Sequence, residues 1–530
     1  MSTEKNVLIE LDISFICNVF GGDEGLMLYI LEKKKDDIKI TDLCKYRGYR
    51  WNESEAIWEK IYKCQLLKHV PELLEKNILI YISNKRILIN CLDKETQKEE
   101  IQKHKDSIIK LEKVLKHVRT EYGQRSIINL MLPNLYDENF IDRLDNSEYN
   151  IDYFPISKRR VVYLPDSTLH ERKRNHYFTH YRDVDIVDEP DKYLNVVNFM
   201  KRIRMCNNLD DSNDMYNLSH ILAGASLSGR RHDKNILIWY GTGNNAKGTS
   251  NYITSKILGN FYLSSPPYIF IDHGKASAGT HQSYLETLRG KRYFNFAELK
   301  QTDRLNESLL KSVCSSVDTL SIRTAGSENT HTLRVYGLPS LETNWIPNIT
   351  ISDKALVDRL RIIFCNAKFV SHNNPDPNKL EFKAMSQSDL EIFIQEHLNS
   401  LFLWYLDGCR LYYQNKCNIS FPSICLTEKA SLLNEQDYNS QIFDDICTLD
   451  PPVTNTTITI PKHYACKNNI YQRYIMEIKN NPKFPKNDVL IKKKFIERFN
   501  SYLESHNCLY PHNDNKKRFI GWSFVSISVS

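Results

Sequence analysis

Residues 235–250, NILIWYGTGNNAKGTS, combine residue types whose order implies a chemical task. Ile236 to Trp239 form a short apolar run typical of a buried parallel strand. A glycine-rich loop and Lys247 follow, and then apolar residues at roughly helical spacing. In a strand, loop and helix arrangement, backbone N–H groups cradle phosphate oxygens while the lysine reaches the terminal phosphates. We predict a phosphate-binding loop with six contributing residues: Gly241, Gly243, Asn245, Lys247, Gly248 and Thr249.

The loop departs from the pattern G-x-x-x-x-G-K-[ST] at two positions. Ala246 stands where the last glycine belongs, and Gly248 stands where the Mg²⁺-binding hydroxyl belongs. Thr249 supplies that hydroxyl if the loop shifts by one residue.

Two alternatives to a phosphate loop remain. Gly241, Gly243 and Ala246 also satisfy the dinucleotide fingerprint G-x-G-x-x-G/A. That pattern needs an acid about 20 positions on, whereas the first downstream acid, Asp272, lies farther away, and it gives Lys247 no task. The segment is otherwise a glycine turn between a core strand and a helix.

Length and composition indicate a soluble globular protein of three or four domains. The chain has 530 residues, 41% of them hydrophobic and 26% charged. No apolar run approaches the roughly 18 residues of a membrane span, and the N-terminus lacks the apolar core of a signal peptide. The 13 cysteines form no C-x-x-C pair, so we expect reduced thiols in an intracellular protein, without disulfides or zinc. The net charge of +6 argues only weakly for an anionic partner.

The region before the loop divides into helical and strand-like parts. Trp51 and Trp58 are most simply core residues of a helical region, and residues 98–118 have the apolar spacing of an amphipathic helix. That helix either packs on its own domain or forms an oligomeric collar. Residues 150–200 contain short β-like runs. There, Asp183 and Asp185 have the D-x-D spacing of a polymerase metal site, although a solvated linker is the favoured interpretation. Residues 192–229 are expected to be helical.

After the loop, several predicted strands end at polar residues. The strand in KRYFNFAELK ends at Glu298, which is a position for a carboxylate that holds Mg²⁺ or polarises water. TLSIRT and TLRVY predict a hairpin with a polar tip. GLPSLETN predicts a strand ending in Asn344, which is suited to orient a water or a γ-phosphate. Arg359 and Arg361 follow, where an arginine near a subunit boundary can stabilise a neighbour's transferring phosphate.

This order of features resembles the superfamily 3 helicases, specifically the primase-helicase family of poxviruses, other large DNA viruses and some phages. The resemblance extends upstream to NHYFTHYRDVDIVDEP in residues 151–191. It extends downstream to LFLWYLDGCRLYYQNK in residues 399–447 and to the C-terminal stretch that ends in KKRFIGWSF. About four fifths of the chain is covered, but only the ATPase motifs are chemically specific.

The resemblance implies roles for individual residues. Lys247 corresponds to the phosphate lysine, Glu298 to the second-motif acid, Asn344 to the sensor asparagine and Arg359 to the arginine finger. Three residues match the segment between the second and third motifs: Lys311, Asp318 and Arg323. The chain also departs from the family pattern at three positions there: Ser316 and Val317 replace two glycines, and Ala297 replaces the first of paired acids.

The predicted fold is α/β, with an AAA+-like phosphate-loop ATPase core. Five segments are expected: a mainly helical N-terminal region (1–150), a pre-helicase segment (151–228), the superfamily 3 ATPase core (229–400), a helical segment (401–450) and a winged-helix-like DNA-binding domain (451–530). The upstream primase domain of related proteins is not recognised, so no primer synthesis by this chain is expected.

The functional hypothesis is a ring, a hexamer, that binds ATP and Mg²⁺ between protomers and translocates on DNA during replication of a virus or a similar element. Thr249 and Glu298 are the predicted metal-binding residues. Single-stranded DNA would contact the hairpin and duplex DNA the C-terminus, through five predicted residues: Arg323, His331, Arg334, Lys516 and Lys517. A separate primase or polymerase is an expected partner, and the host compartment stays open. The alternative is a non-hydrolysing DNA-binding scaffold with a degenerate loop.

Overall fold

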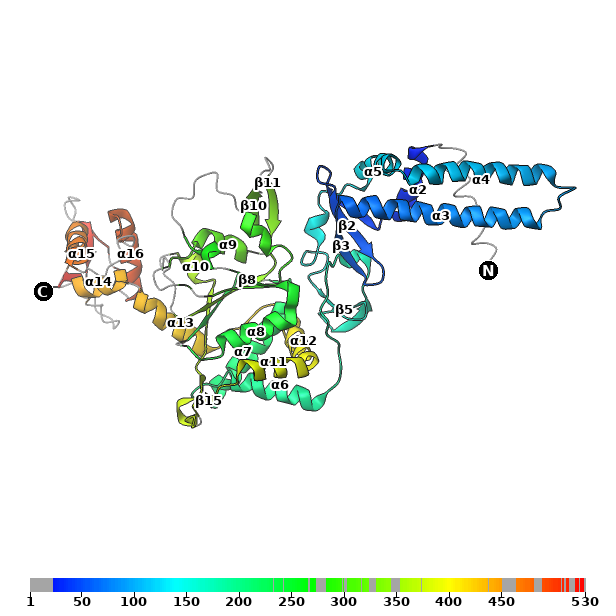
Figure 1. Ribbon diagram of the computed structural model, residues 1–530. Coiled ribbons are helices and arrows are strands. Elements are labelled where there is room, and N and C mark those ends of the chain that lie inside the picture. The colour runs from blue at the N-terminus through cyan, green and yellow to red at the C-terminus, as the bar shows by residue number, and fades with distance from the viewer. Residues whose placement is uncertain are drawn as a thin grey trace.

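The protein is described by a computed structural model in which three bodies follow one another along the chain (Figure 1). The described residues are 22–231, 233–241, 243–265, 267–272, 283–297, 299, 303–315, 317–323, 330–344, 353–372, 374–436, 438–449, 464–480, 489–506, 508–509, 511–513, 520–523 and 525–528. In this part of the chain, no helix combines the length and hydropathy that crossing a bilayer requires.

In the described residues, the N-terminal body joins a small antiparallel sheet, β1-β2-β3, to four α-helices. Its elements are α2 (Asp23–Lys34), β1 (Ile38–Asp42), β2 (Arg47–Asn52), β3 (Ile57–Ile61), α3 (Lys63–Cys91), α4 (Lys98–Val118) and α5 (Glu121–Leu135). Helices α3 and α4 pack against each other and form a long arm that extends away from the central body (Figure 1). The predicted amphipathic helix is confirmed, because α4 spans residues 98–118 and buries Ile108, Leu111, Leu115 and Val118.

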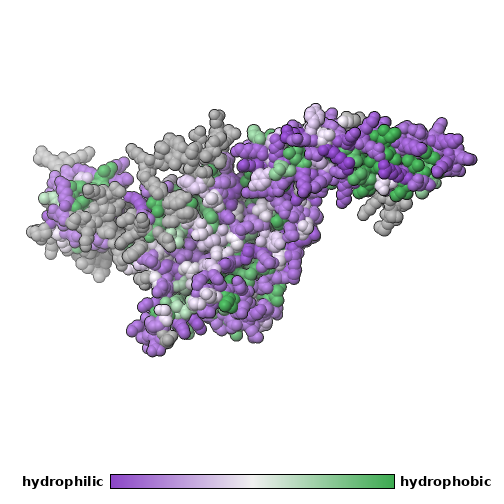
Figure 2. Space-filling view, viewed as in Figure 1, coloured by the Kyte–Doolittle hydropathy of each residue, from purple (hydrophilic) through white to green (hydrophobic). Residues whose placement is uncertain are grey.

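The arm also carries exposed apolar side chains, which contribute to its hydrophobic colouring in Figure 2. They come from both helices: Leu79, Ile80, Ile87, Leu88 and Ile109. The predicted oligomeric collar stays a prediction.

The prediction of a helical region around Trp51 and Trp58 is wrong. Both side chains are buried, as expected, but they face each other across β2 and β3 as a registered pair, with ring centroids 5.7 Å apart. The four residues between the strands make a tight turn in which Ala56 takes a left-handed φ of 53°. Edge-to-face packing of the two indoles is a typical cross-strand contact that stabilises such a short hairpin.

The segment after the arm confirms the predicted short strands and helices. It contains a three-stranded antiparallel sheet and two helices: β4 (Tyr153–Ile156), β5 (Arg160–Tyr163), β6 (Thr168–Glu171), α6 (Pro190–Arg202) and α7 (Leu209–Leu227). Asp185 is not solvated as the linker interpretation expects, because its carboxylate pairs with Lys158 at 2.6 Å and with Arg160, whereas Asp183 and Asp188 are exposed. Among the described residues, no group of three or more His, Cys, Asp or Glu side chains could hold a metal ion.

The central body is built on a five-stranded parallel sheet in the order β13-β7-β12-β9-β8. Its elements are β7 (Ile236–Tyr240), α8 (Lys247–Leu258), β8 (Tyr262–Ser265), β9 (Tyr293–Ala297), α9 (Glu307–Cys314), β10 (Thr319–Arg323), β11 (Thr330–Arg334), β12 (Leu338–Thr343), α10 (Lys354–Val357) and β13 (Leu360–Phe364). Strands β10 and β11 form the predicted antiparallel hairpin.

The two faces of this sheet bury different clusters of side chains. Leu237 and Trp239 of β7 face a core that includes α7, α8 and α12, whereas Ile236 and Ile238 face α9 and the β10-β11 hairpin. Alternate residues of one strand are therefore buried on opposite faces, which is why the strand sequence is a continuous apolar run. The result is a three-layer α/β arrangement.

Further helices and short strands complete the central body: β14 (Lys368–Val370), β15 (Glu381–Lys383), α11 (Gln387–Glu396), α12 (Leu398–Gln414) and α13 (Ser423–Gln436). Helices α11 and α12 lie on the α8 side of the sheet, and α13 packs on the edge strand β13. Helix α12 packs closely on α7 through two glycines. A Cβ on Gly224 would lie 2.0 Å from the backbone nitrogen of Cys409, and one on Gly408 would lie 2.0 Å from the carbonyl oxygen of His220.

The C-terminal body lies beyond α13, at the end of the molecule opposite the arm (Figure 1). Its elements are α14 (Tyr438–Ile446), β16 (Cys447–Leu449), β17 (Tyr464–Cys466), α15 (Lys467–Asn480), α16 (Lys492–Ser505), β18 (Pro511–Asn513), β19 (Ile520–Ser523) and β20 (Val525–Ile527). Phe495, Phe499, Tyr502 and Trp522 are buried in its core. Phe495, Phe499 and Tyr502 therefore form the packed side of α16, against Trp522 of β19, while Lys492, Lys493 and Lys494 are exposed. The winged-helix assignment stays a prediction.

Candidate nucleotide-binding site

The predicted phosphate loop connects β7 to α8, and α8 begins at Lys247. Three loop residues have left-handed backbones, with φ of 107° at Gly243, 50° at Asn244 and 59° at Ala246. A Cβ on Gly241 would lie 1.8 Å from the side-chain nitrogen of Asn245, so any other residue there would displace that amide. A Cβ on Gly243 would meet nothing within 4 Å, so the loop borders open space on that side.

Lys247 is buried at the carboxyl end of the sheet and donates to three neutral oxygens. Its ammonium Nζ lies 2.6 Å from the Gly241 carbonyl, 3.0 Å from Asn245 Oδ1 and 2.9 Å from Asn344 Oδ1. Burial lowers the pKa of this ammonium, and the nearby Glu342 carboxylate opposes the shift. A buried cation held by neutral acceptors is well suited to receive an anion.

The strands that carry the predicted site residues are neighbours. β12 lies between β7 and β9, and all three are parallel. Their carboxyl ends therefore meet at one edge of the sheet, where α/β proteins bind ligands. Asn344 follows β12 and reaches Lys247 directly. Glu298 follows β9 but lies outside the described residues.

The strand order disfavours the dinucleotide alternative. After α8 the chain enters β8, which is an edge strand separated from β7 by β12 and β9. A dinucleotide-binding unit instead places the second strand beside the first, so that its acidic residue reaches the ribose.

Glu342 is a site residue that the sequence interpretation missed. It lies on β12 and points toward α8, where its Oε1 accepts hydrogen bonds from Asn251 and, at 2.7 Å, from Asn295. Its Oε2 lies 3.7 Å from the position that a Cβ on Gly248 would occupy. A signal was available, since a carboxylate within the apolar strand sequence LPSLET requires polar partners or a function.

Arg204 is a second missed residue, and it positions the first turn of α8. Its guanidinium is fully enclosed and donates to Ser219 Oγ at 2.6 Å and to Ser250 Oγ at 2.7 Å. It also lies over the Trp239 ring, 4.6 Å from the centroid. Burial lowers the pKa of the Arg204 guanidinium. The two serine hydroxyls that accept its hydrogen bonds carry no negative charge that would oppose this shift.

Arg359 lies at the opposite edge of the sheet from Lys247. Its carbonyl accepts from the Ile236 amide at the start of β7, and its side chain donates to the Ala355 carbonyl. The five-residue strand β7 separates Arg359 from the loop. At a rise of roughly 3.3 Å per residue, the length of that strand is about 16 Å. Arg359 therefore cannot reach the loop of its own chain. Arg361 donates to Asn235 Oδ1 at 2.8 Å and is equally remote.

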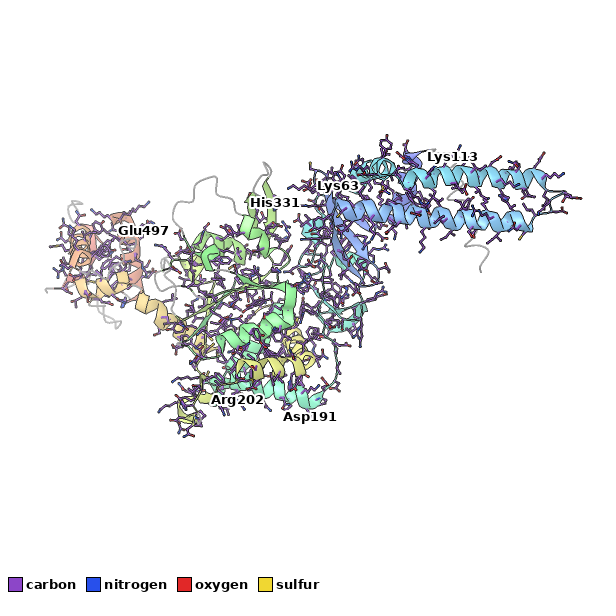
Figure 3. All side chains as sticks on the ribbon, viewed as in Figure 1. Lys63, Lys113, Asp191, Arg202, His331 and Glu497 are labelled. Atoms are coloured by element: carbon purple, nitrogen blue, oxygen red, sulfur yellow. The ribbon has the colours of Figure 1, made fainter. Side chains whose placement is uncertain are left out.

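Two of the three predicted DNA-binding residues of the hairpin have described side chains. His331 on β11 (Figure 3) lies 3.0 Å from Glu286 Oε2. Arg334 is exposed and lies over the Tyr336 ring. Arg323 belongs to β10, but its side chain and residues 324–329, which include most of the predicted tip, lie outside the described residues, as do Lys516 and Lys517.

The described residues fit a nucleoside triphosphate with Mg²⁺. The loop supplies open space, a helix N-terminus and a buried ammonium, which together suit phosphate oxygens. Thr249, half-buried in the first turn of α8, is the nearest hydroxyl to position 248 along the chain. Mg²⁺ in such sites uses one or two carboxylates together with substrate phosphates, so the lack of a larger acidic cluster among the described residues is compatible with it.

Sequence comparison relates the chain to proteins of large DNA viruses, although no family model matches it. It is 23% identical over 332 residues to a putative helicase of Acanthamoeba polyphaga mimivirus. The aligned residues are 62% of this chain and 32% of that protein. It is 25% identical over 239 residues to a putative helicase of Frog virus 3, covering 44% of this chain and 24% of that protein. A putative primase of African swine fever virus is 21% identical over 296 residues, which are 51% of this chain and 30% of that protein.

The chain thus spans only about a quarter to a third of the length of the curated relatives it matches. Among solved structures, the apo C-terminal region of NrS-1 aligns with 94% of this chain and 98% of its own, at 12% identity and a TM-score of 0.45.

Proposed function

We propose that this chain is an ATP-dependent DNA helicase of the superfamily 3 type that acts in replication of a DNA virus. The observation that carries the proposal is the contact between Lys247 and Asn344. It joins a loop lysine to a strand-end asparagine on the next strand of a parallel sheet, at 2.9 Å. The distant relation to proteins named putative helicases of large DNA viruses supports the same conclusion.

In this proposal each residue has a defined task at the phosphates. Lys247 binds the β- and γ-phosphates, and Asn344 orients the attacking water. Thr249 and Glu298 hold Mg²⁺, which, when bound, neutralises charge on the phosphate oxygens. Burial of Lys247 strengthens its attraction to those oxygens because little water screens it.

The location of Arg359 supports a ring in this proposal. Because this arginine is about 16 Å from the loop of its own chain, it serves only the loop of an adjacent copy. We propose that the ring is a closed, head-to-tail hexamer. In it, the end of the sheet that carries Arg359 in one protomer faces the phosphate loop of its neighbour. Nucleotide turnover then changes contacts between protomers.

DNA contacts in the proposal come from the hairpin and the C-terminal body. The hairpin grips the single-stranded backbone in the pore through Arg323, His331 and Arg334, and basic residues such as Lys516 and Lys517 contact duplex DNA. A separate primase or polymerase completes the replication machinery.

A second candidate function is a non-hydrolysing DNA-binding scaffold. Two loop positions favour it. Ala246 holds a left-handed backbone that ordinarily belongs to glycine, and Gly248 offers no hydroxyl to a metal ion. Both changes are expected to reduce turnover more than folding.

ATPase measurements with and without single-stranded DNA separate the two functions. For a helicase, the natural chain hydrolyses ATP, DNA stimulates the rate, and Lys247→Ala abolishes it. Lys256→Ala is the matched control, since it removes an exposed lysine from the same helix. Equal background rates for the natural chain and Lys247→Ala would favour the scaffold. A strand-displacement assay on a forked duplex then tests unwinding itself.

A further inference from the structure

Glu342 occupies an unusual place beside the phosphate loop. On the face of the sheet toward α8, the carboxyl end of β12 presents this carboxylate instead of an apolar side chain. Two amide groups, from Asn251 on α8 and Asn295 on β9, hold Oε1. The carboxylate is thereby fixed between the loop helix and the neighbouring strand, with Oε2 directed toward Gly248.

The two positions where the chain departs from the usual metal-binding pattern both adjoin Glu342. Phosphate-loop enzymes hold Mg²⁺ through a hydroxyl directly after the loop lysine and through an acid at the end of a nearby strand. Here the first of these positions is Gly248, and a Cβ there would lie 3.7 Å from Glu342 Oε2. At the end of β9, Ala297 is the registered partner of Glu342 across the parallel pair.

Registered residues on adjacent parallel strands point to the same face of the sheet. An acid at position 297 would therefore place its carboxylate on the face that Glu342 occupies, about one strand spacing (roughly 4.8 Å) away. Glu342 has one more methylene than an aspartate, and it approaches Gly248 from β12. It can thus deliver an oxygen to the space between positions 248 and 297.

We propose that Glu342 joins Thr249 and Glu298 as a ligand of the nucleotide-bound divalent cation and supplies an oxygen beside positions 248 and 297, where the side chains of Gly248 and Ala297 offer none. This inference rests on the proposed nucleotide-binding function and deepens it. It explains how a loop without a hydroxyl at position 248 keeps a charged ligand next to that position. The amides of Asn251 and Asn295 act as positioning groups, because their hydrogen bonds to Oε1 hold the carboxylate between α8 and β9.

The test measures Mn²⁺ binding to the full chain with ADP, by electron paramagnetic resonance. Glu342→Gln keeps an acceptor oxygen for the two amides but removes the charge. We expect it to weaken Mn²⁺ binding by about tenfold or more, while ADP binding in EDTA is retained. Glu396→Gln, an exposed change of the same chemistry on α11, should behave as the natural chain. Adding Ala297→Asp to Glu342→Gln should restore much of the Mn²⁺ affinity.

The outcomes separate this inference from the proposed function. A natural chain that binds neither ADP nor Mn²⁺–ADP would overturn both. If the natural chain binds Mn²⁺–ADP and Glu342→Gln binds it equally well, the ligand role of Glu342 is wrong and the nucleotide site stands.

A second measurement needs no substitution, so it decides the matter even if Glu342→Gln misfolds. Fe²⁺ bound with ADP to the natural chain, then treated with ascorbate and peroxide, cleaves backbone next to the metal. Fragments that end at residues 341–343 support the inference. Cleavage confined to other segments contradicts it.

Discussion

Replacing Asn344 with alanine should tighten ADP binding and slow ATP hydrolysis. Lys247 gives one of its three hydrogen bonds to Asn344 Oδ1, at 2.9 Å. Phosphate oxygens must share or replace these acceptors before they can bind the ammonium. Asn344 therefore competes with ADP for Lys247, although it later helps to orient water at the γ-phosphate.

The size of the effect follows from the energy of that bond. A hydrogen bond to a charged group contributes about 1.5–3 kcal/mol net. Because Asn344 is itself exposed, we take the low end of the range. An energy of about 1.5 kcal/mol corresponds to roughly a tenfold change in Kd. Asn344→Ala should thus lower the Kd for ADP by about tenfold, and calorimetry measures it directly.

Asn344→Asp is the matched opposite change. Its carboxylate would pair with Lys247 more strongly than the amide does and would repel phosphate, so the Kd for ADP should rise above that of the natural chain. The turnover number for ATP should fall in both variants, since neither keeps the amide that orients water. A Kd for ADP that is unchanged or higher in a folded Asn344→Ala would refute the competition and show that Lys247 keeps this bond when nucleotide binds.

Three further predictions concern backbone strain, packing and pH. Ala246→Gly should stabilise the fold by about 1 kcal/mol, seen as a higher thermal midpoint, because it relieves a left-handed alanine at φ 59°; a lower midpoint would mean that position 246 is unstrained. Gly408→Ala should lower the free energy of unfolding by about 3 kcal/mol or more, since its Cβ would lie 2.0 Å from the His220 carbonyl oxygen. Gln414→Ala, an exposed change on the same helix, should leave the free energy of unfolding unchanged. Burial lowers the pKa of His176 from 6.5 to about 4. The folded chain therefore binds fewer protons than the unfolded chain between these values, and stability should fall as pH drops from 6.5 to 4; His176→Asn should flatten this decline in thermal midpoint, and an equal decline in both proteins would contradict the argument.

The elements around the loop could be predicted from sequence because their signals are local. The apolar run before Gly241, the alternating pattern of the hairpin and the spacing in α4 each concern residues within a few positions of one another. The β2-β3 hairpin failed for the same reason. The strand IWEKI contains Glu59 and Lys60, residue types that also favour a helix, and the registered contact of Trp51 with Trp58 depends on a turn at Ala56.

The order of the strands in the sheet could not be predicted from the sequence. The position of Glu342 in the site depends on that order. Glu342 is 94 positions after Gly248 and 45 positions after Ala297 in the chain. Only the insertion of β12 between β7 and β9 brings the three together. A sequence pattern that requires an acid at the end of β9 does not detect an acid on the neighbouring strand β12.

Buried arginines connect parts of the chain that the sequence analysis treated as separate segments. Arg292, fully buried before β9, donates to the carbonyls of Leu227, Asn150 and Tyr153. It thereby ties the segment before the loop to the central sheet, and one core cluster accordingly contains both Phe154 and residues of α8. Every residue has a carbonyl, so such acceptors leave no trace in the sequence. A buried arginine is visible only as one more basic residue, and the attachment it makes must be found in the structure.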